Sequence, residues 1–122
     1  MIIPTLRYQD AKAAIDFLER AFGLERHHIT ENDDGTVAHA ELTHGSGVVM
    51  LGTARGDDTF STGRAVIYVV TGDPDDVHDR AKAAGATIVQ ELTDQDYGSR
   101  EFAAEDSEGN VWSFGTYDPF AA

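Results

Sequence analysis

The sequence contains no cysteine, only three prolines among 122 residues, and no long apolar run. Without cysteine the chain has no disulfide, no thiolate nucleophile, no zinc finger and no iron–sulfur cluster, and its redox compartment is left open. The longest apolar stretch, residues 65–70, is far shorter than the roughly 20 residues of a membrane-spanning helix. Because the N-terminal residues also lack the basic and apolar parts of a signal peptide, we expect a cytoplasmic protein.

Basic residues are scarce as well. Nine Lys and Arg stand against 22 Asp and Glu, which gives a formal charge of −13. Nucleic acids and anionic membranes bind to positive surface, so we expect neither as a partner. The acid excess favours neutral or cationic ligands, although a high negative charge also serves to keep a protein in solution. The hydrophobic fraction of 41% is ordinary for a globular chain and predicts a real core.

Two halves of the chain are related by a period of 63 residues. Gly35 and Gly52 are each followed by threonine, and 63 residues later Gly98 and Gly115 are followed by serine and threonine. Each half reads as a strand, a helix and three strands. The helices are expected near 11–22 and 75–84, and the strands near 2–8, 25–31, 36–44, 47–53, 65–71, 86–91, 99–105 and 110–116. We therefore divide one domain, residues 1–122, into module one (1–54), a linker (55–63) and module two (64–118).

Two stretches of the chain resemble a known family. The helix DAKAAIDFLERAFG at residues 10–23 and the closing run from Tyr97 through DSEGNVWSF at 106–114 resemble the glyoxalase, bleomycin-resistance and extradiol dioxygenase superfamily, also called the vicinal oxygen chelate superfamily. Ser107 stands where that family usually has proline. The resemblance implies an α+β fold in which two βαβββ modules form a curved mixed sheet around a concave groove, with the helices on the convex face. It also implies a homodimer.

The same resemblance bears on metal binding. Metal-using members take four ligands, usually His and Glu, from the first and last strands of each module. Those positions correspond here to Ile3, Met50, Val66 and Ser113. None of the four carries the imidazole or carboxylate that a divalent metal prefers. We therefore expect no cofactor and a binding protein rather than an enzyme, with a divalent metal as the alternative.

Strand periodicity predicts which side chains face away from the helices. Alternate residues of a strand point to opposite faces, and the helix covers one of them. Trp112 and Phe114 have the parity of the helix side and should lie in the core. Tyr68 and Phe102 are expected to stack on a flat ligand, whereas Arg7 and Arg100 either bind a ligand anion or pair with acidic residues. The full predicted ligand-binding set is Arg7, His39, Glu41, Met50, Tyr68, Arg100, Phe102 and Ser113.

His39 and Glu41 place an imidazole and a carboxylate on one face of one strand. A hydrogen-bonded pair of this kind orients a ligand or acts as acid and base. The same residues would also suit a metal site or a solvated polar face, and the sequence leaves these alternatives open. His27 and His28 are neighbours on a strand, so they should point in opposite directions at the surface.

The leading hypothesis is a metal-independent protein that binds a small organic molecule, such as a cationic drug or metabolite, in the groove of a homodimer. It would then be similar to the drug-binding resistance proteins of the superfamily. One alternative is a metal-dependent lyase, isomerase or dioxygenase of the same superfamily that uses His39 and Glu41. Another is a metal-free isomerase with either residue as the base. The identity of the ligand, and whether modules pair within one chain or between chains, are left open.

Overall fold

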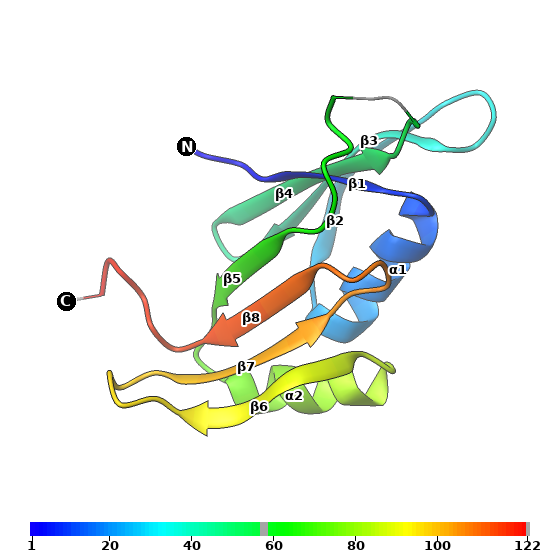
Figure 1. Cartoon of the computed structure of the whole chain (residues 1–122). Helices are drawn as coiled ribbons and strands as arrows, with labels where there is room; N and C mark the ends of the chain where they lie inside the picture. Colours follow the sequence, from blue (N-terminus) through cyan, green and yellow to red (C-terminus); the bar gives the residue numbers. More distant parts are fainter. Residues whose placement is uncertain (57–58, 122) are drawn as a thin grey trace. The chain divides into compact units, whose positions relative to one another are not determined.

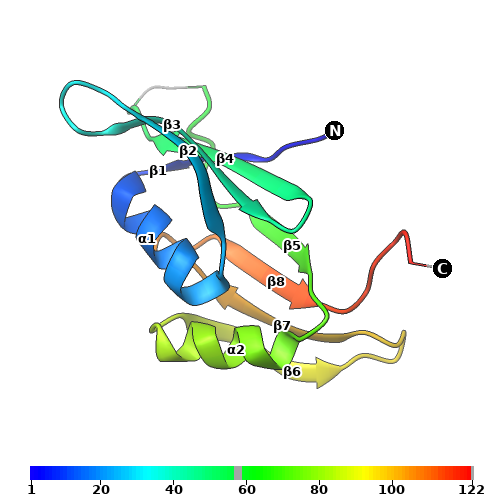
Figure 2. The same ribbon diagram turned by 180° about the vertical axis from the view of Figure 1, so that it is seen from behind.

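Each half of the chain folds around its own sheet. The computed structural model describes residues 1–56 and 59–121, and its residues divide into two units, 1–63 and 64–122. Each unit is a βαβββ module with a four-stranded mixed sheet, so the predicted α+β class and the repeated module are confirmed (Figures 1 and 2). The predicted linker, 55–63, includes positions 57 and 58, which lie outside the described residues. In the described part of the chain no helix is long and apolar enough to cross a membrane.

The first module contains one helix and four strands. They are β1 (Thr5–Tyr8), α1 (Ala11–Phe22), β2 (Glu25–Glu31), β3 (Val37–His44) and β4 (Gly47–Thr53). The sheet order is β1-β4-β3-β2, in which β1 and β4 are parallel and the other neighbours antiparallel. Strands β2 and β4 have the boundaries that the sequence predicted.

Helix α1 begins and ends where its sequence allows. The Asp10 carboxylate accepts a hydrogen bond from the Ala13 backbone N–H at 3.0 Å, which satisfies a donor that the first turn leaves unpaired. Gly23 ends the helix with φ of 73°, a left-handed conformation that favours glycine. The apolar face of α1 packs on β1 and β4 and forms the core with the sheet residues Leu6, Tyr8, Ala40, Leu42 and Leu51.

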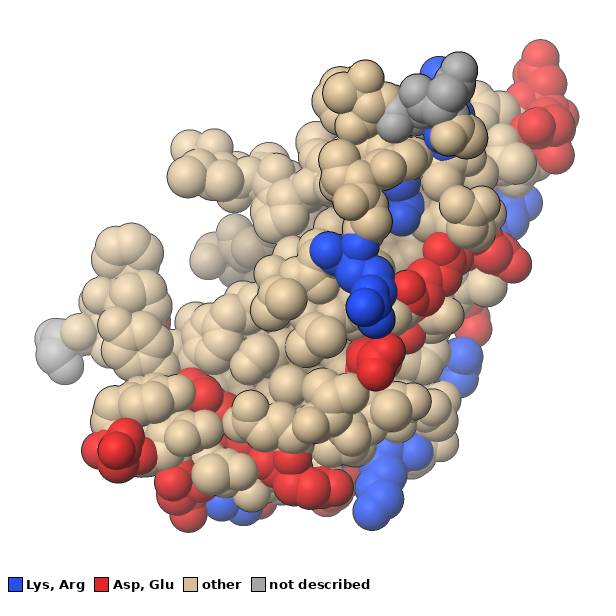
Figure 3. Space-filling view, viewed as in Figure 1, with Lys and Arg blue, Asp and Glu red and all other residues tan. Residues whose placement is uncertain are grey.

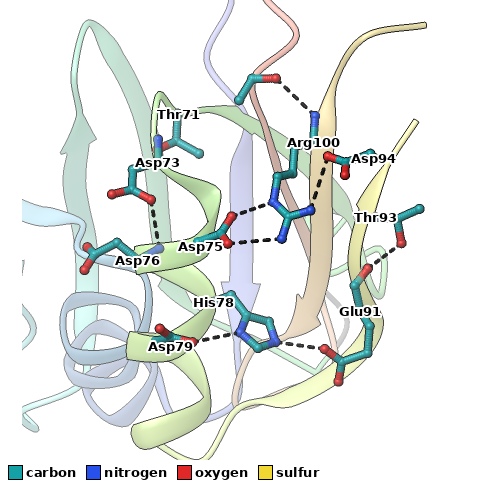
Figure 4. Close-up of polar contacts among 11 residues, drawn as sticks. Thr71, Asp73, Asp75, Asp76, His78, Asp79, Glu91, Thr93, Asp94 and Arg100 are labelled. Carbon is teal, nitrogen blue, oxygen red and sulfur yellow. Dashed lines mark hydrogen bonds and ion pairs between the residues drawn. The ribbon is translucent and has the colours of Figure 1, made fainter. Parts of the chain in front are cut away.

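The second module repeats this arrangement. Its elements are β5 (Val66–Val70), α2 (Pro74–Ala83), β6 (Thr87–Asp94), β7 (Arg100–Glu105) and β8 (Val111–Gly115), with sheet order β5-β8-β7-β6. Asp73 caps α2 by accepting a hydrogen bond from the Asp76 N–H at 3.1 Å (Figure 4). Trp112 and Phe114 are almost completely buried, as their parity predicted.

A one-residue difference in β3 breaks the 63-residue offset between the modules. Leu51 of β4 pairs with Ala40, and Phe114 of β8 pairs with Phe102. Leu51 and Phe114 are 63 residues apart, but Ala40 and Phe102 are only 62 apart. The pairing of β2 with β3 shows the cause, because it steps from His39 to Val37 and leaves Ala38 as an extra, bulged residue. His39 therefore corresponds to Glu101, and Glu41 corresponds to Ala103.

Candidate functional site

Two residues predicted to face a ligand lie instead on the helix side of the second sheet. Phe102 is fully buried, and its ring stacks on Phe114 with centroids 5.2 Å apart. Its other neighbour is the His78 ring of α2, also at 5.2 Å and edge-on. The prediction that Phe102 stacks on a ligand is therefore wrong. The offset of 63 was applied to β7, where the bulge in β3 has made it 62 and has reversed the parity.

Arg100 is the second correction. Its guanidinium donates to both carboxylate oxygens of Asp75 in α2, at 2.7 and 3.1 Å, and to Asp94 of β6 at 3.2 Å (Figure 4). The hydrogen bonds from Arg100 hold the pKa of Asp75 below its usual range, and the two acidic partners raise the pKa of Arg100. On the same side His78 lies between Asp79 and Glu91. Arg100 thus ties α2 to the sheet, and its prediction as a ligand contact is wrong.

On the open face of the first sheet, the face not covered by α1, His39 and Glu41 form the pair that their spacing suggested. His39 Nε2 donates to Glu41 Oε2 at 2.9 Å. A register shift between Arg26 and His28 brings His27 to the same side, with Nε2 3.9 Å from the other Glu41 oxygen, while His28 pairs across the strands with Glu41. The expectation that His27 and His28 point apart therefore fails. The hydrogen bond from His39, with the nearby charge of all three histidines, lowers the pKa of Glu41.

Arg7 and Met50 share that face of the first module. Met50 lies in register between Thr5 of β1 and Glu41 of β3. Arg7 lies across Gly52, where an added Cβ would be 2.8 Å from Arg7 Nη1. The Arg7 guanidinium carbon is 5.5 Å from the centre of the Phe60 ring, which is within the range of a cation–π contact. Four of the eight predicted residues are thus brought together on one sheet.

The residues present do not fit the family's metal. Ile3, Met50, Val66 and Ser113 offer alkyl, thioether and hydroxyl groups where imidazole and carboxylate would be needed. Elsewhere in residues 1–56 and 59–121, no three His, Asp or Glu side chains are grouped so that they could hold an ion. No step that passes through a metal is derived for this chain.

The open face of the second sheet, opposite α2, contains a cleft of about 590 Å³. Four side chains line it: Tyr68 from β5, Tyr97 from the β6–β7 turn, Glu101 from β7 and Tyr117 from the segment after β8. Ser113 lies in register with Tyr68 on the neighbouring strand. The sequence predicted Tyr68 and Ser113 on this face but missed Glu101 and Tyr117. The alternation of Phe102 and Ala104 with charged neighbours was the signal that would have found Glu101.

Hydrogen bonds hold the cleft residues in place. Tyr97 Oη donates to Glu101 Oε1 at 2.7 Å, and Tyr68 Oη donates to the backbone carbonyl of Tyr117 at 2.8 Å. The rings of Tyr97 and Tyr117 are nearly perpendicular, with centroids 6.4 Å apart. Gly115 makes room for this arrangement, because an added Cβ would lie 2.6 Å from Glu101 Cγ and 2.7 Å from Tyr68 Oη. The cleft is therefore built from side chains of fixed position.

The charge of Glu101 acts on the cleft tyrosines. The hydrogen bond to Glu101, together with its negative charge, raises the pKa of Tyr97 to about 12. Burial is the main cause that raises the pKa of Tyr68. Over β5 and β8 the surface seen in Figure 3 is mainly uncharged, and acidic side chains gather along its lower edge, over β6. An apolar, aromatic surface thus surrounds a single carboxylate.

Comparison with known proteins identifies the family. A profile of the Glyoxalase/Bleomycin resistance protein/Dioxygenase superfamily matches residues 3–114. The chain belongs to this superfamily. The crystal structure of TioX from Micromonospora sp. ML1 is 32% identical, with a TM-score of 0.81, and the match covers 100% of this chain and 99% of TioX. An uncharacterized protein of Mycobacterium bovis is 32% identical over 121 residues, which cover 92% of this chain and 80% of the relative.

A more distant superfamily member shows the same fold. The protein from Sphaerobacter thermophilus is 18% identical, with a TM-score of 0.74 and coverage of 93% of both chains. At that identity the likeness speaks for the fold alone. The resemblance seen in the sequence, including the paired βαβββ modules, is thereby confirmed.

Proposed function

We propose that this superfamily member binds a small organic molecule without a metal ion, and that the ligand occupies the cleft of the second module. The observation that carries this proposal is the cleft itself, where three tyrosines surround one carboxylate. Small-molecule sites typically combine an aromatic, apolar lining with a few well-placed polar groups. Side chains already held by hydrogen bonds also lose little freedom when a ligand binds.

The proposal is tested by thermal shift with EDTA-treated protein and a panel of antibiotics and small metabolites. A ligand at one hundred times its Kd adds about 2.7 kcal/mol of stability, which raises Tm by several degrees. Tyr68→Leu should abolish the shift for any hit. The matched control is Phe120→Leu, which changes an aromatic residue 94% exposed and outside the cleft. A panel without any stabilising compound would contradict the proposal.

A second candidate function is supported by the pair on the first module. The 2.9 Å contact between His39 and Glu41 has the geometry of an acid–base pair, and this would make the chain an enzyme, either metal-free or with a divalent metal. Metal analysis of the purified protein separates the two forms. A stoichiometric ion that disappears in the His39→Ala, Glu41→Ala variant would support the metal enzyme over metal-independent binding. His44→Ala, on the same strand, is the control.

We also propose that two copies of the chain associate. A module of roughly 60 residues buries too little surface to be robust alone, so pairing of modules is favoured. Sedimentation velocity at micromolar concentration should give twice the monomer mass of 13.2 kDa. A monomer under those conditions would refute the association.

A further inference from the structure

Glu101 differs from the other buried carboxylate of the second module in its partners. Asp106 is 6% exposed, and its two oxygens accept hydrogen bonds from the Asn110 backbone and side chain, from Trp112 Nε1 and from the Glu108 backbone. Glu101 is 8% exposed and accepts from Tyr97 Oη through Oε1 alone. The role of Asp106 is thus explained by the hairpin that it closes, whereas that of Glu101 is not.

No cation of the chain neutralises Glu101. Among the described residues no Lys, Arg or His forms an ion pair with it, and Oε2 has no hydrogen bond to any of them. Arg100, its neighbour on the strand, points to the other face and is taken by Asp75 and Asp94. A carboxylate withdrawn from water without a cationic partner costs several kcal/mol, and a cation that arrives with a ligand removes that cost.

The tyrosines around Glu101 favour the same kind of ligand. Tyr68, Tyr97 and Tyr117 are 40%, 60% and 52% exposed, so ring surface is open to a ligand in the cleft. The face of an aromatic ring attracts a cation, most strongly where water is displaced. No basic side chain lines the cleft, so nothing there would attract an anion. Ring faces and a carboxylate therefore act together on one positive charge.

We propose that the cleft of Tyr68, Tyr97, Glu101 and Tyr117 binds the protonated amino group of a small organic ligand, with Glu101 Oε2 accepting a hydrogen bond from the ammonium. This inference rests on the proposed function and names the ligand class for the same site. The rest of the ligand contacts the tyrosine rings. A protonated amine fits better than a quaternary ammonium, because only an N–H uses the open oxygen of Glu101.

The test compares two probes of matched shape, 2-naphthylmethylamine and 2-naphthylmethanol, at pH 7 by isothermal titration calorimetry. The amine is cationic and the alcohol neutral. A hydrogen bond to a charged group predicts that the amine binds about tenfold tighter or more. Glu101→Gln should lower the affinity for the amine by a similar factor and leave the alcohol within about threefold. Equal affinities for the two probes, or an unchanged amine affinity in Glu101→Gln, would overturn the inference.

The matched control variant is Glu105→Gln. It removes the same charge from the same strand but does not line the cleft, so both affinities should stay within about threefold. If both variants weaken the amine equally, overall charge is responsible and the site assignment falls. Should Glu101→Gln fail to fold, Tyr97→Leu serves instead. Its side chain is 60% exposed, and loss of one ring face should weaken amine binding roughly fivefold. Unchanged binding would count against the inference.

The ligand's place is read from the tyrosine ring signals in NMR spectra. The chain has four tyrosines, three of which line the cleft, while Tyr8 is fully buried in the first module and serves as an internal reference. The amine should shift the three signals and not that of Tyr8. If amine and alcohol shift them equally, the proposed function stands and the ammonium inference fails. If neither probe shifts them, the inference fails, and the ligand panel decides the proposed function separately.

Discussion

Gly52 and Gly115 hold equivalent positions in the two modules, yet each makes room for a side chain of opposite charge. In the first module Arg7 lies across Gly52, and in the second Glu101 lies across Gly115 beside Tyr68. Both glycines have this role for the same reason, because a Cβ at either position would meet the crossing side chain at less than 3 Å. The repeated fold has thus kept a space over the last strand and filled it with different chemistry.

The charges on the two faces are also balanced differently. In the first module Glu41 accepts a hydrogen bond from His39, and Arg7 lies over the Phe60 ring. In the second module Glu101 has one tyrosine hydroxyl and no cation among its described neighbours. The difference shows that a duplicated module supplies a scaffold twice without supplying the same site twice. It favours the second module as the place for a charged ligand.

The largest expected effect tests which side of β7 is buried. Phe102→Ala should lower the free energy of unfolding by about 4 kcal/mol, because it empties a core position between Phe114 and His78. Urea denaturation measures the loss. Tyr68→Leu, which changes a residue 40% exposed on the other face, should cost less than about 1 kcal/mol. Similar losses for the two variants would contradict the assigned parity.

The next effect distinguishes the two closing hairpins. The β7–β8 hairpin depends on the buried Asp106 carboxylate, whereas the β3–β4 hairpin turns at Gly45, whose φ of 55° favours glycine. Asp106→Ala leaves donors of Asn110 and Trp112 unpaired and should cost about 3 kcal/mol in urea denaturation. Ser46→Ala in the other hairpin should change stability by less than about 0.5 kcal/mol. Losses of equal size would mean that both hairpins close by the same means.

The two glycines provide a more direct test of the comparison. Gly115→Ala should cost about 2 kcal/mol by overpacking and should displace Glu101 and Tyr68, so amine binding is expected to be lost. Gly52→Ala meets the flexible end of Arg7 and the Ala38 carbonyl, so it should lower stability and leave amine binding intact. Calorimetric titration of both variants with 2-naphthylmethylamine is the measurement. Binding lost equally in both would place the site elsewhere.

The smallest effect is a pH dependence from the first module. The folded-state pKa of Glu41 lies below its ordinary value of 4.5, mainly because His39 donates a hydrogen bond to the carboxylate. The stabilising contribution is therefore fully present above pH 4.5 and is lost as pH falls through the lowered pKa. Wild type should have a higher Tm than Glu41→Gln at pH 6, and the gap should narrow toward pH 3. A gap that does not change with pH would contradict this linkage.

Most of the architecture could be predicted from local patterns. The two helices lie within a residue or two of their predicted ranges, and β2 and β4 match theirs, because caps, glycines and apolar periodicity are written in neighbouring residues. The burial of Trp112 and Phe114 followed from strand alternation. The pairing of His39 with Glu41 followed from their spacing of two on one strand.

Register was less accessible to prediction. Ala38 has no counterpart in β7, and nothing in the residues around it marks a bulge, so Arg100 and Phe102 were assigned to the wrong face. A shift of one residue exchanges the two faces of a strand, and only pairing with the adjacent strand reveals it. Glu101 was missed for this reason.

The sequence alone determined two βαβββ modules, their element order, the apolar core and the absence of suitable side chains at the family's metal positions. Each of these depends on residue identity and on patterns that repeat within a few residues. Only the tertiary structure decided that Glu101 meets Tyr68, Tyr97 and Tyr117 on one face of the second sheet. These four residues come from segments separated by up to 49 positions, and they meet because β8 pairs with both β5 and β7.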